Sequence, residues 1–148
     1  MTGWGWVALG AGAMFTGATV YFALARVPRW RTMQVRTFLP DFARVIKVAD
    51  KVQPFFLVVT IASAALFVSS TEGTADLLGG AAIAGFAVTM LASLGVLVPL
   101  QRRMIKLGPD PAQRIEAMRE RWLKGHLGRA SLATLSFVLL VAAVLTAS

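Results

Sequence analysis

The sequence contains no cysteine and only one histidine, His126. The lack of thiols excludes disulfides, thiolate zinc sites, iron–sulfur clusters and thiol catalysis. A single histidine also excludes metal centres built from several histidines. Nucleotide-binding glycine patterns are absent as well, because Gly3, Gly5, Gly10 and Gly12 lie inside an apolar run. We therefore expect no metal and no cofactor.

Charged residues are scarce too: they make up 15% of the 148 residues, against about 25% in a soluble domain. Mean hydropathy is +0.69. Four stretches carry no charge, and each is long enough to cross a hydrocarbon core about 30 Å thick: 1–25, 52–71, 77–101 and 130–148. The sequence therefore predicts an all-α, integral-membrane four-helix bundle and argues against a water-soluble enzyme. We expect a single domain over residues 1–148, with spans at about 4–25, 53–71, 78–100 and 128–147.

The basic residues are distributed unevenly. All 15 of them fall in two segments, 26–51 and 102–129, whereas the link between the second and third uncharged stretches holds only Glu72 and Asp76. Basic segments beside membrane spans stay in the cytoplasm. We thus predict that both termini and the link at 72–76 lie outside. The net charge of +8 then reflects topology and contact with anionic lipid headgroups, and we expect no nucleic-acid partner.

Both basic segments are predicted to form amphipathic helices on the cytoplasmic side. Asp41 fits a helix N-cap, and apolar residues recur at helical spacing from Phe42 onward. Pro54 indicates a kink or a new helix start at the second span. In the second basic segment, Asp110 fits the N-cap of a helix that runs to about Ala147.

The predicted spans contain hydroxyl groups but no ionisable residue at depth. Proton relays and ion pathways depend on intramembrane ionisable groups, so we expect no pumping or ion conduction. Small residues in the first and third spans recur four positions apart, a spacing that lets helix backbones approach closely. They indicate either contact with a partner helix or packing within the bundle: Ala8, Gly12, Ala13, Gly17, Gly80, Ala84 and Gly85.

One polar group of residues lies where the fourth span enters the membrane. Trp122, His126 and Arg129 follow one another at i, i+4 and i+7, which places them on one face of a helix. They could form the mouth of a binding site for a headgroup, an anion or a substrate, with His126 as proton acceptor. They could also form an interfacial anchor, with the indole at the headgroup level and the guanidinium on a phosphate.

Two motifs carry a resemblance to a known family. The stretch 98–103 (VPLQRR) ends the third span, and the stretch 121–129 (RWLKGHLGR) opens the fourth. They resemble elements of the small four-helix membrane proteins related to fungal and bacterial anthrone oxygenases. Residues matching the two elements are Pro99, Gln101 and Arg103, and then Trp122, His126 and Arg129; Gln101 stands where many members carry Asn. The resemblance implies cofactor-free oxidation of an anthrone to an anthraquinone, an activity that most family members need not have.

Two functions follow from these features. The first is a non-catalytic accessory subunit that stabilises a larger membrane complex of other integral membrane proteins, for example a lipid or envelope transporter in a bacterial inner membrane. Uncharged spans and small-residue faces favour it. The alternative is an enzyme on a lipophilic aromatic substrate, with His126 as base, Arg129 stabilising a phenolate and Trp122 stacking on the ring.

Overall fold

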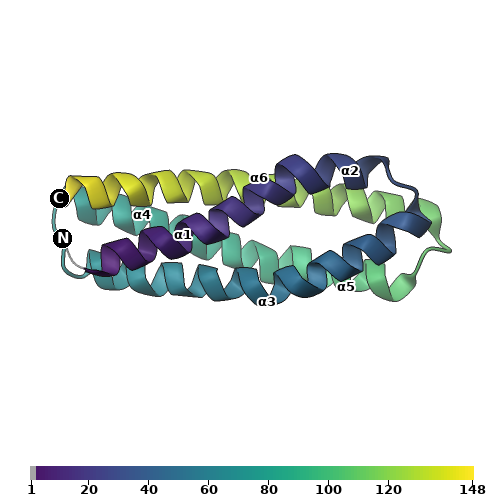
Figure 1. The fold of residues 1–148 in the computed structure, drawn as a ribbon, viewed down its shortest axis with the longest axis horizontal. Helices are drawn as coiled ribbons and strands as arrows, with labels where there is room; N and C mark the ends of the chain where they lie inside the picture. The colour runs from purple at the N-terminus through teal and green to yellow at the C-terminus, as the bar shows by residue number, and fades with distance from the viewer. Residues whose placement is uncertain (1–2) are drawn as a thin grey trace.

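The computed structural model describes residues 3–148, which form long helices joined by short links. Four helical segments lie side by side along the long axis of the molecule (Figure 1). Each is long and apolar enough to cross a membrane: Gly3–Thr32, Val35–Val68, Thr74–Leu107 and Ala112–Thr146. The prediction of an all-α membrane bundle with four spanning helices is confirmed.

Two of the four segments contain a widened, π-helical turn. The first segment comprises α1 (Gly3–Tyr21), the turn η1 (Phe22–Arg26) and α2 (Val27–Thr32), and the third comprises α4 (Thr74–Ala92), the turn η2 (Ser93–Leu97) and α5 (Val98–Leu107). Each turn is followed by a proline, Pro28 or Pro99, near the start of the next helix. A proline ring collides with the carbonyl four residues earlier, and a π-helical turn just before it relieves that collision. The other two segments are single helices, α3 (Val35–Val68) and α6 (Ala112–Thr146).

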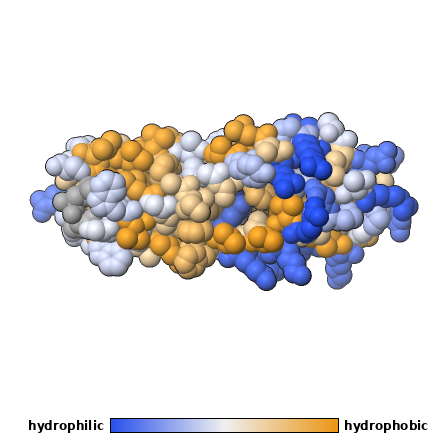
Figure 2. Space-filling model, in the orientation of Figure 1, coloured by the Kyte–Doolittle hydropathy of each residue, from blue (hydrophilic) through white to orange (hydrophobic). Residues whose placement is uncertain are grey.

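The two ends of the bundle differ in character. Figure 1 places the start of α1, the α3–α4 link and the end of α6 at one end, and α2 and the α5–α6 link at the other. Figure 2 shows a mostly apolar surface over the half of the bundle next to the first end, and hydrophilic side chains gathered over the half next to the second. Both basic segments therefore meet at one end, as a membrane protein with basic cytoplasmic segments requires.

Two predicted helix N-caps were wrong, and no new helix starts at Pro54, where a kink stays a prediction. Helix α3 already begins at Val35 and continues through Pro54, so Asp41 lies inside the helix and its carboxylate accepts the indole N–H of Trp30 instead. Helix α6 begins at Ala112, and its N-cap makes no side-chain hydrogen bond, so Asp110 does not cap it. The predicted end of the last helix, about Ala147, agrees with the observed end at Thr146.

The core changes along the bundle. In the apolar half, small residues and phenylalanines interdigitate, among them Ala8, Phe15, Ala82 and Phe86. At the basic end, aromatic rings replace them, and the ring of Trp30 lies 5.2 Å from Phe42 and 5.9 Å from Trp122, centroid to centroid. Such edge-to-face contacts add to the stabilisation from buried area. They hold α2 and the start of α3 against α6.

The predicted small-residue faces divide into two groups. Ala8 and Gly12 are buried, and a Cβ on Gly12 would lie 3.1 Å from Phe137. Gly85 lies directly against Ser136 of α6. These positions pack within the bundle, whereas the other four are exposed on its surface: Ala13, Gly17, Gly80 and Ala84.

Most hydroxyl groups of the spans bond to backbone carbonyls of their own helices. Thr60 donates to Phe56 O at 2.7 Å, and Ser136 donates to Leu132 O at 2.8 Å. Most of the intramembrane hydroxyls are therefore used locally. Ser93 also bonds to another helix: it donates to Thr89 O and accepts a hydrogen bond from Arg129 of α6.

Candidate functional site

The single histidine lies in the middle of the bundle. His126 of α6 is 1% exposed, and its Nε2 lies 3.1 Å from the backbone oxygen of Thr19. A carbonyl oxygen can only accept, so Nε2 carries the proton and Nδ1 is the basic nitrogen of the neutral ring. Among residues 3–148, Nδ1 has no hydrogen-bond partner. The fold thus holds a buried imidazole with its lone pair free.

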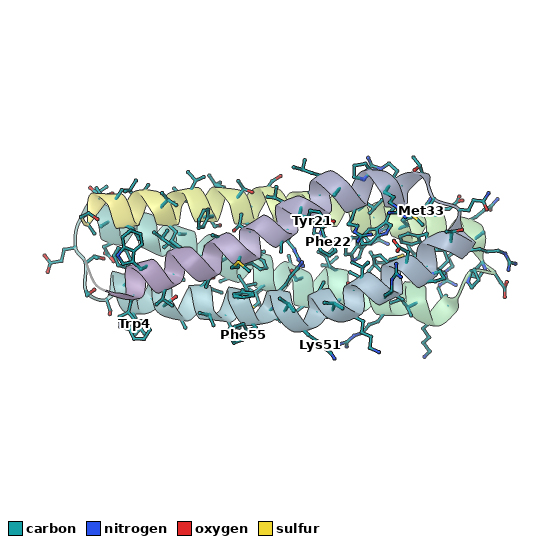
Figure 3. All side chains as sticks on the ribbon, viewed as in Figure 1. Trp4, Tyr21, Phe22, Met33, Lys51 and Phe55 are labelled. Carbon is teal, nitrogen blue, oxygen red and sulfur yellow. The ribbon has the colours of Figure 1, made fainter. Side chains whose placement is uncertain are left out.

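The imidazole is held between two aromatic rings. Trp122 stacks on it with centroids 5.2 Å apart and planes 10° apart, and Phe22 of η1 lies 5.9 Å away on another side. Figure 3 shows Phe22 where the first helical segment passes the centre of the bundle. The π-helical turn that begins at Phe22 therefore contributes a wall of the site, and π-helical turns are frequent at functional sites.

A chain of hydrogen bonds runs from Trp122 to the bundle surface. The indole N–H of Trp122 donates to Gln101 Oε1 at 3.3 Å, and Gln101 Nε2 donates to Asp50 Oδ2 at 2.7 Å. The carboxylate can only accept, so it orients the amide of Gln101 with its oxygen towards Trp122. This chain joins α3, α5 and α6 and fixes the indole that stacks on His126.

Arg129 occupies the opposite side of the site. Its guanidinium donates to Gln53 Oε1 and, at 3.1 Å, to Ser93 Oγ, and it lies 5.8 Å from the ring centroid of Phe15. Its Nε has no hydrogen-bond partner in the part of the chain that the structure describes. The side chain therefore turns inwards, between helices, and keeps one donor free.

Two spaces adjoin these residues. A hole of about 20 Å³ lies among His126, Trp122, Gln101, Gln53 and Arg129, which is room for one water molecule. A groove of about 210 Å³ lies beyond it, between α3 and the α4–η2 region. The two spaces are adjacent, because five residues line both of them: Ala49, Asp50, Gln53, Val98 and Arg129.

A second polar group lies nearer the basic end and has a structural role. Asp41 Oδ2 accepts the indole N–H of Trp30 at 2.8 Å, and Oδ1 accepts from Arg44 at 2.8 Å. The hydrogen bond from Trp30 lowers the pKa of Asp41 below its ordinary value of 3.8, against the opposing effect of burial, and Arg44 and Arg26 lower it further. Arg119 donates to Met33 O at 2.6 Å and closes the α2–α3 link over α6.

The structure brings together most of the residues that the sequence singled out. Trp122, His126, Arg129 and Gln101 surround one site, and Trp122 and His126 face the interior and not the lipid. The other two residues of the resemblance lie apart from it, both exposed: Pro99 and Arg103.

Sequence analysis missed two members of the site, Asp50 and Gln53. They lie three residues apart on α3, at the entrance of the second span. A signal existed, because Asp50 is the acidic residue closest to an uncharged stretch on the basic side of the chain. Its partner Gln101 is 51 positions away, so spacing alone could not reveal the pair.

The site residues do not form a metal centre. Within residues 3–148, His, Asp and Glu side chains nowhere gather in a group of three or more that could hold a metal ion.

A family model described as anthrone oxygenase matches residues 42–139. This range contains Asp50, Gln53, Gln101, Trp122, His126 and Arg129. No curated protein and no solved structure matches the chain.

Proposed function

The chain belongs to the anthrone oxygenase family, and we propose that it is a membrane-embedded oxygenase for a lipophilic hydroxyaromatic substrate. The observation that carries the proposal is the environment of His126. Its Nε2 proton is held by Thr19 O, its Nδ1 is unpartnered within the described chain, and Arg129 lines the same hole. A buried imidazole in one defined tautomer beside a guanidinium is suited to removing a proton and stabilising the resulting anion.

The reaction implied by the family requires such a base. An anthrone loses the two hydrogens of its ring methylene and gains one oxygen, while the second atom of dioxygen leaves as water. The first step transfers a proton from the methylene carbon to the base, and the electron pair spreads onto the substrate oxygen. This carbanion reacts with dioxygen, and the hydroperoxide that forms loses water to give the second carbonyl.

Three residues of the site have a role in this scheme. Nδ1 of His126 accepts the proton, directly or through one water in the adjacent hole, and Arg129 stabilises the negative charge on the substrate oxygen. Trp122 fixes the plane of the imidazole by stacking on it, which replaces the substrate-stacking role expected from the sequence.

Substitution of His126 by glutamine tests the proposal. His126→Gln keeps an N–H that can reach Thr19 O but has no basic nitrogen. We expect oxygen consumption with an anthrone-type substrate, measured on protein in nanodiscs, to fall by about 10²–10⁴-fold. Lys124→Gln, an exposed change on the same helix, serves as the control and should retain activity. If His126→Gln and the unmodified protein consume oxygen at equal rates and melt at equal temperatures, His126 is not the base and the mechanism is refuted.

A second candidate function is an accessory subunit of a membrane complex. The four exposed small residues Ala13, Gly17, Gly80 and Ala84 favour it, because such residues let a neighbouring helix approach closely. The host we propose is a lipid or envelope transporter in a bacterial inner membrane. Native mass spectrometry after extraction in mild detergent tests this candidate: a stoichiometric partner supports it, and an unaccompanied chain contradicts it.

A further inference from the structure

The groove between α3 and the α4–η2 region is open towards the surrounding lipid. Its outer wall includes Val58 and Leu94, which are 54% and 60% exposed, and both lie in predicted membrane spans. Towards the bundle interior it is closed by Phe15, Leu57 and Met90. A molecule dissolved in the bilayer can therefore reach the groove sideways, without first entering water.

Polarity changes along the groove in one direction. Its apolar part is formed by Leu57 and Met90, deeper in the spans, whereas Asp50, Gln53 and Ser93 lie nearer the basic end. An amphiphile in a bilayer orients in the same way, with its rings among the acyl chains and its polar group towards the headgroups. The polar and apolar ends of the groove thus point the same way as those of an amphiphile in the cytoplasmic leaflet.

The polar end presents both donors and acceptors. Arg129 contributes a guanidinium, which can donate, while Asp50 and Gln53 contribute side-chain oxygens, which can accept. Pro54 adds to the acceptors, because it has no N–H to bond the backbone carbonyl of Asp50. A hydroxyl group can donate to Asp50 or Gln53 and accept from Arg129. A carboxylate can only accept, and it would meet the negative charge of Asp50.

The volume limits the size of the ligand. An engineered cavity of about 150 Å³ holds benzene in a protein core. At about 210 Å³ the groove encloses roughly two fused rings, and further rings would extend through the open side into lipid.

From these observations we infer that the α3–α4 groove binds a flat, lipophilic molecule with a neutral hydroxyl head, which enters sideways from the bilayer. His126, whose Nδ1 has no hydrogen-bond partner within the described residues, lines the adjoining hole together with Arg129 and Gln53, so the head of such a ligand would lie close to its ring. The inference rests on the proposed function where it treats this ligand as the substrate. Binding itself is measured without turnover.

The groove on the other flank of α3 offers a matched control. It lies between α1 and α3 and includes Val48, which is 62% exposed. Val58→Phe places a ring in the mouth of the α3–α4 groove, and Val48→Phe makes the same change on the same helix in the other groove. Both side chains face outwards, so both variants are expected to fold.

The experiment uses a diazirine-labelled naphthol and protein in phosphatidylcholine nanodiscs. After photolysis, mass spectrometry maps the labelled peptides, and unlabelled 2-naphthol, 2-naphthoate and naphthalene compete at matched membrane concentrations. We expect labelling on residues 50–58 and 90–98, with 2-naphthol competing about tenfold better than the other two, the effect of one hydrogen bond to a charged group. Val58→Phe should reduce specific labelling about tenfold, and Val48→Phe should change it less than twofold.

Several outcomes would overturn the inference: labelling confined to the α1–α3 groove, equal effects of the two phenylalanine variants, or competition by naphthalene as strong as by 2-naphthol. Stronger competition by 2-naphthoate than by 2-naphthol would show that the groove prefers an anionic ligand, and the hydroxyl ligand inferred above would be wrong. Failure of the proposed function has a different signature, since His126→Gln should keep the labelling. Labelling in the α3–α4 groove without oxygen consumption refutes only the oxygenase.

Discussion

His126 owes its chemistry to contacts made by residues distant in the sequence. Thr19, 107 positions earlier, fixes its tautomer, and Trp122 fixes its plane. Gln101 and Asp50 in turn fix the indole. Removing one member of this chain is costly, because its buried members Gln101 and Trp122 then lose a partner.

Asp41 provides a prediction at the residue scale. Its pKa is lowered in the folded protein, so its stabilising effect is complete above the ordinary value of 3.8 and disappears as the pH falls through the folded value. We expect Asp41→Asn to destabilise the fold by about 1–2 kcal/mol at neutral pH, a few degrees in melting temperature. The difference from the unmodified protein should shrink as the pH is lowered from about 7 to about 2.

Tryptophan fluorescence during heating measures this effect in detergent. Asp110→Asn is the control, because the side chain of Asp110 is 88% exposed and lies 3.6 Å from an exposed Arg36. That variant should have the same melting temperature as the unmodified protein at every pH. A deficit of Asp41→Asn that stays constant down to the lowest pH would contradict the assignment.

At the scale of helices, packing separates glycines that look alike in the sequence. Gly80 and Gly85 both lie on α4 and both fit a small-residue spacing. A Cβ on Gly80 would meet nothing within 4 Å, whereas a Cβ on Gly85 would collide with Ser136, whose hydroxyl is bonded to Leu132 O. Only Gly85 is therefore required by the bundle itself.

Alanine at the two positions should have opposite effects. Gly80→Ala is expected to stabilise the helix by about 0.5–1 kcal/mol, because alanine loses less backbone entropy. Gly85→Ala is expected to destabilise by about 1–3 kcal/mol through overpacking. Melting temperatures in the same detergent compare them directly, and a Gly85→Ala protein as stable as Gly80→Ala would show that the α4–α6 contact is looser than described.

The helices also show which sequence rules hold. Length and hydropathy predicted the number of spanning helices correctly, and the end of α6 was found within a residue. The capping predictions at Asp41 and Asp110 failed, because each rule considers only a few neighbours. In the fold, Asp41 is used by Trp30, which reaches it from α2.

For the whole molecule, the untested prediction is orientation. The chain has no cysteine, so single cysteines can be introduced without background labelling. We expect Glu72→Cys to react with a membrane-impermeant maleimide in intact cells. Lys124→Cys should react only after the membrane is permeabilised, because basic segments stay in the cytoplasm. The reverse pattern would invert the topology and place the polar end of the groove in the outer leaflet.

The sequence alone determined the fold class, the number of spanning helices and the family. Hydropathy and charge act on each segment separately through its partition between water and lipid, so they can be read along the chain. Only the tertiary structure decided that Trp122 and His126 face inwards, that Asp50 and Gln53 join them, and that a groove lies beside Arg129. These features depend on which faces of helices far apart in the sequence pack together. A polar side chain at the membrane boundary can form its hydrogen bonds either with lipid headgroups or with another helix, and the sequence does not distinguish the two.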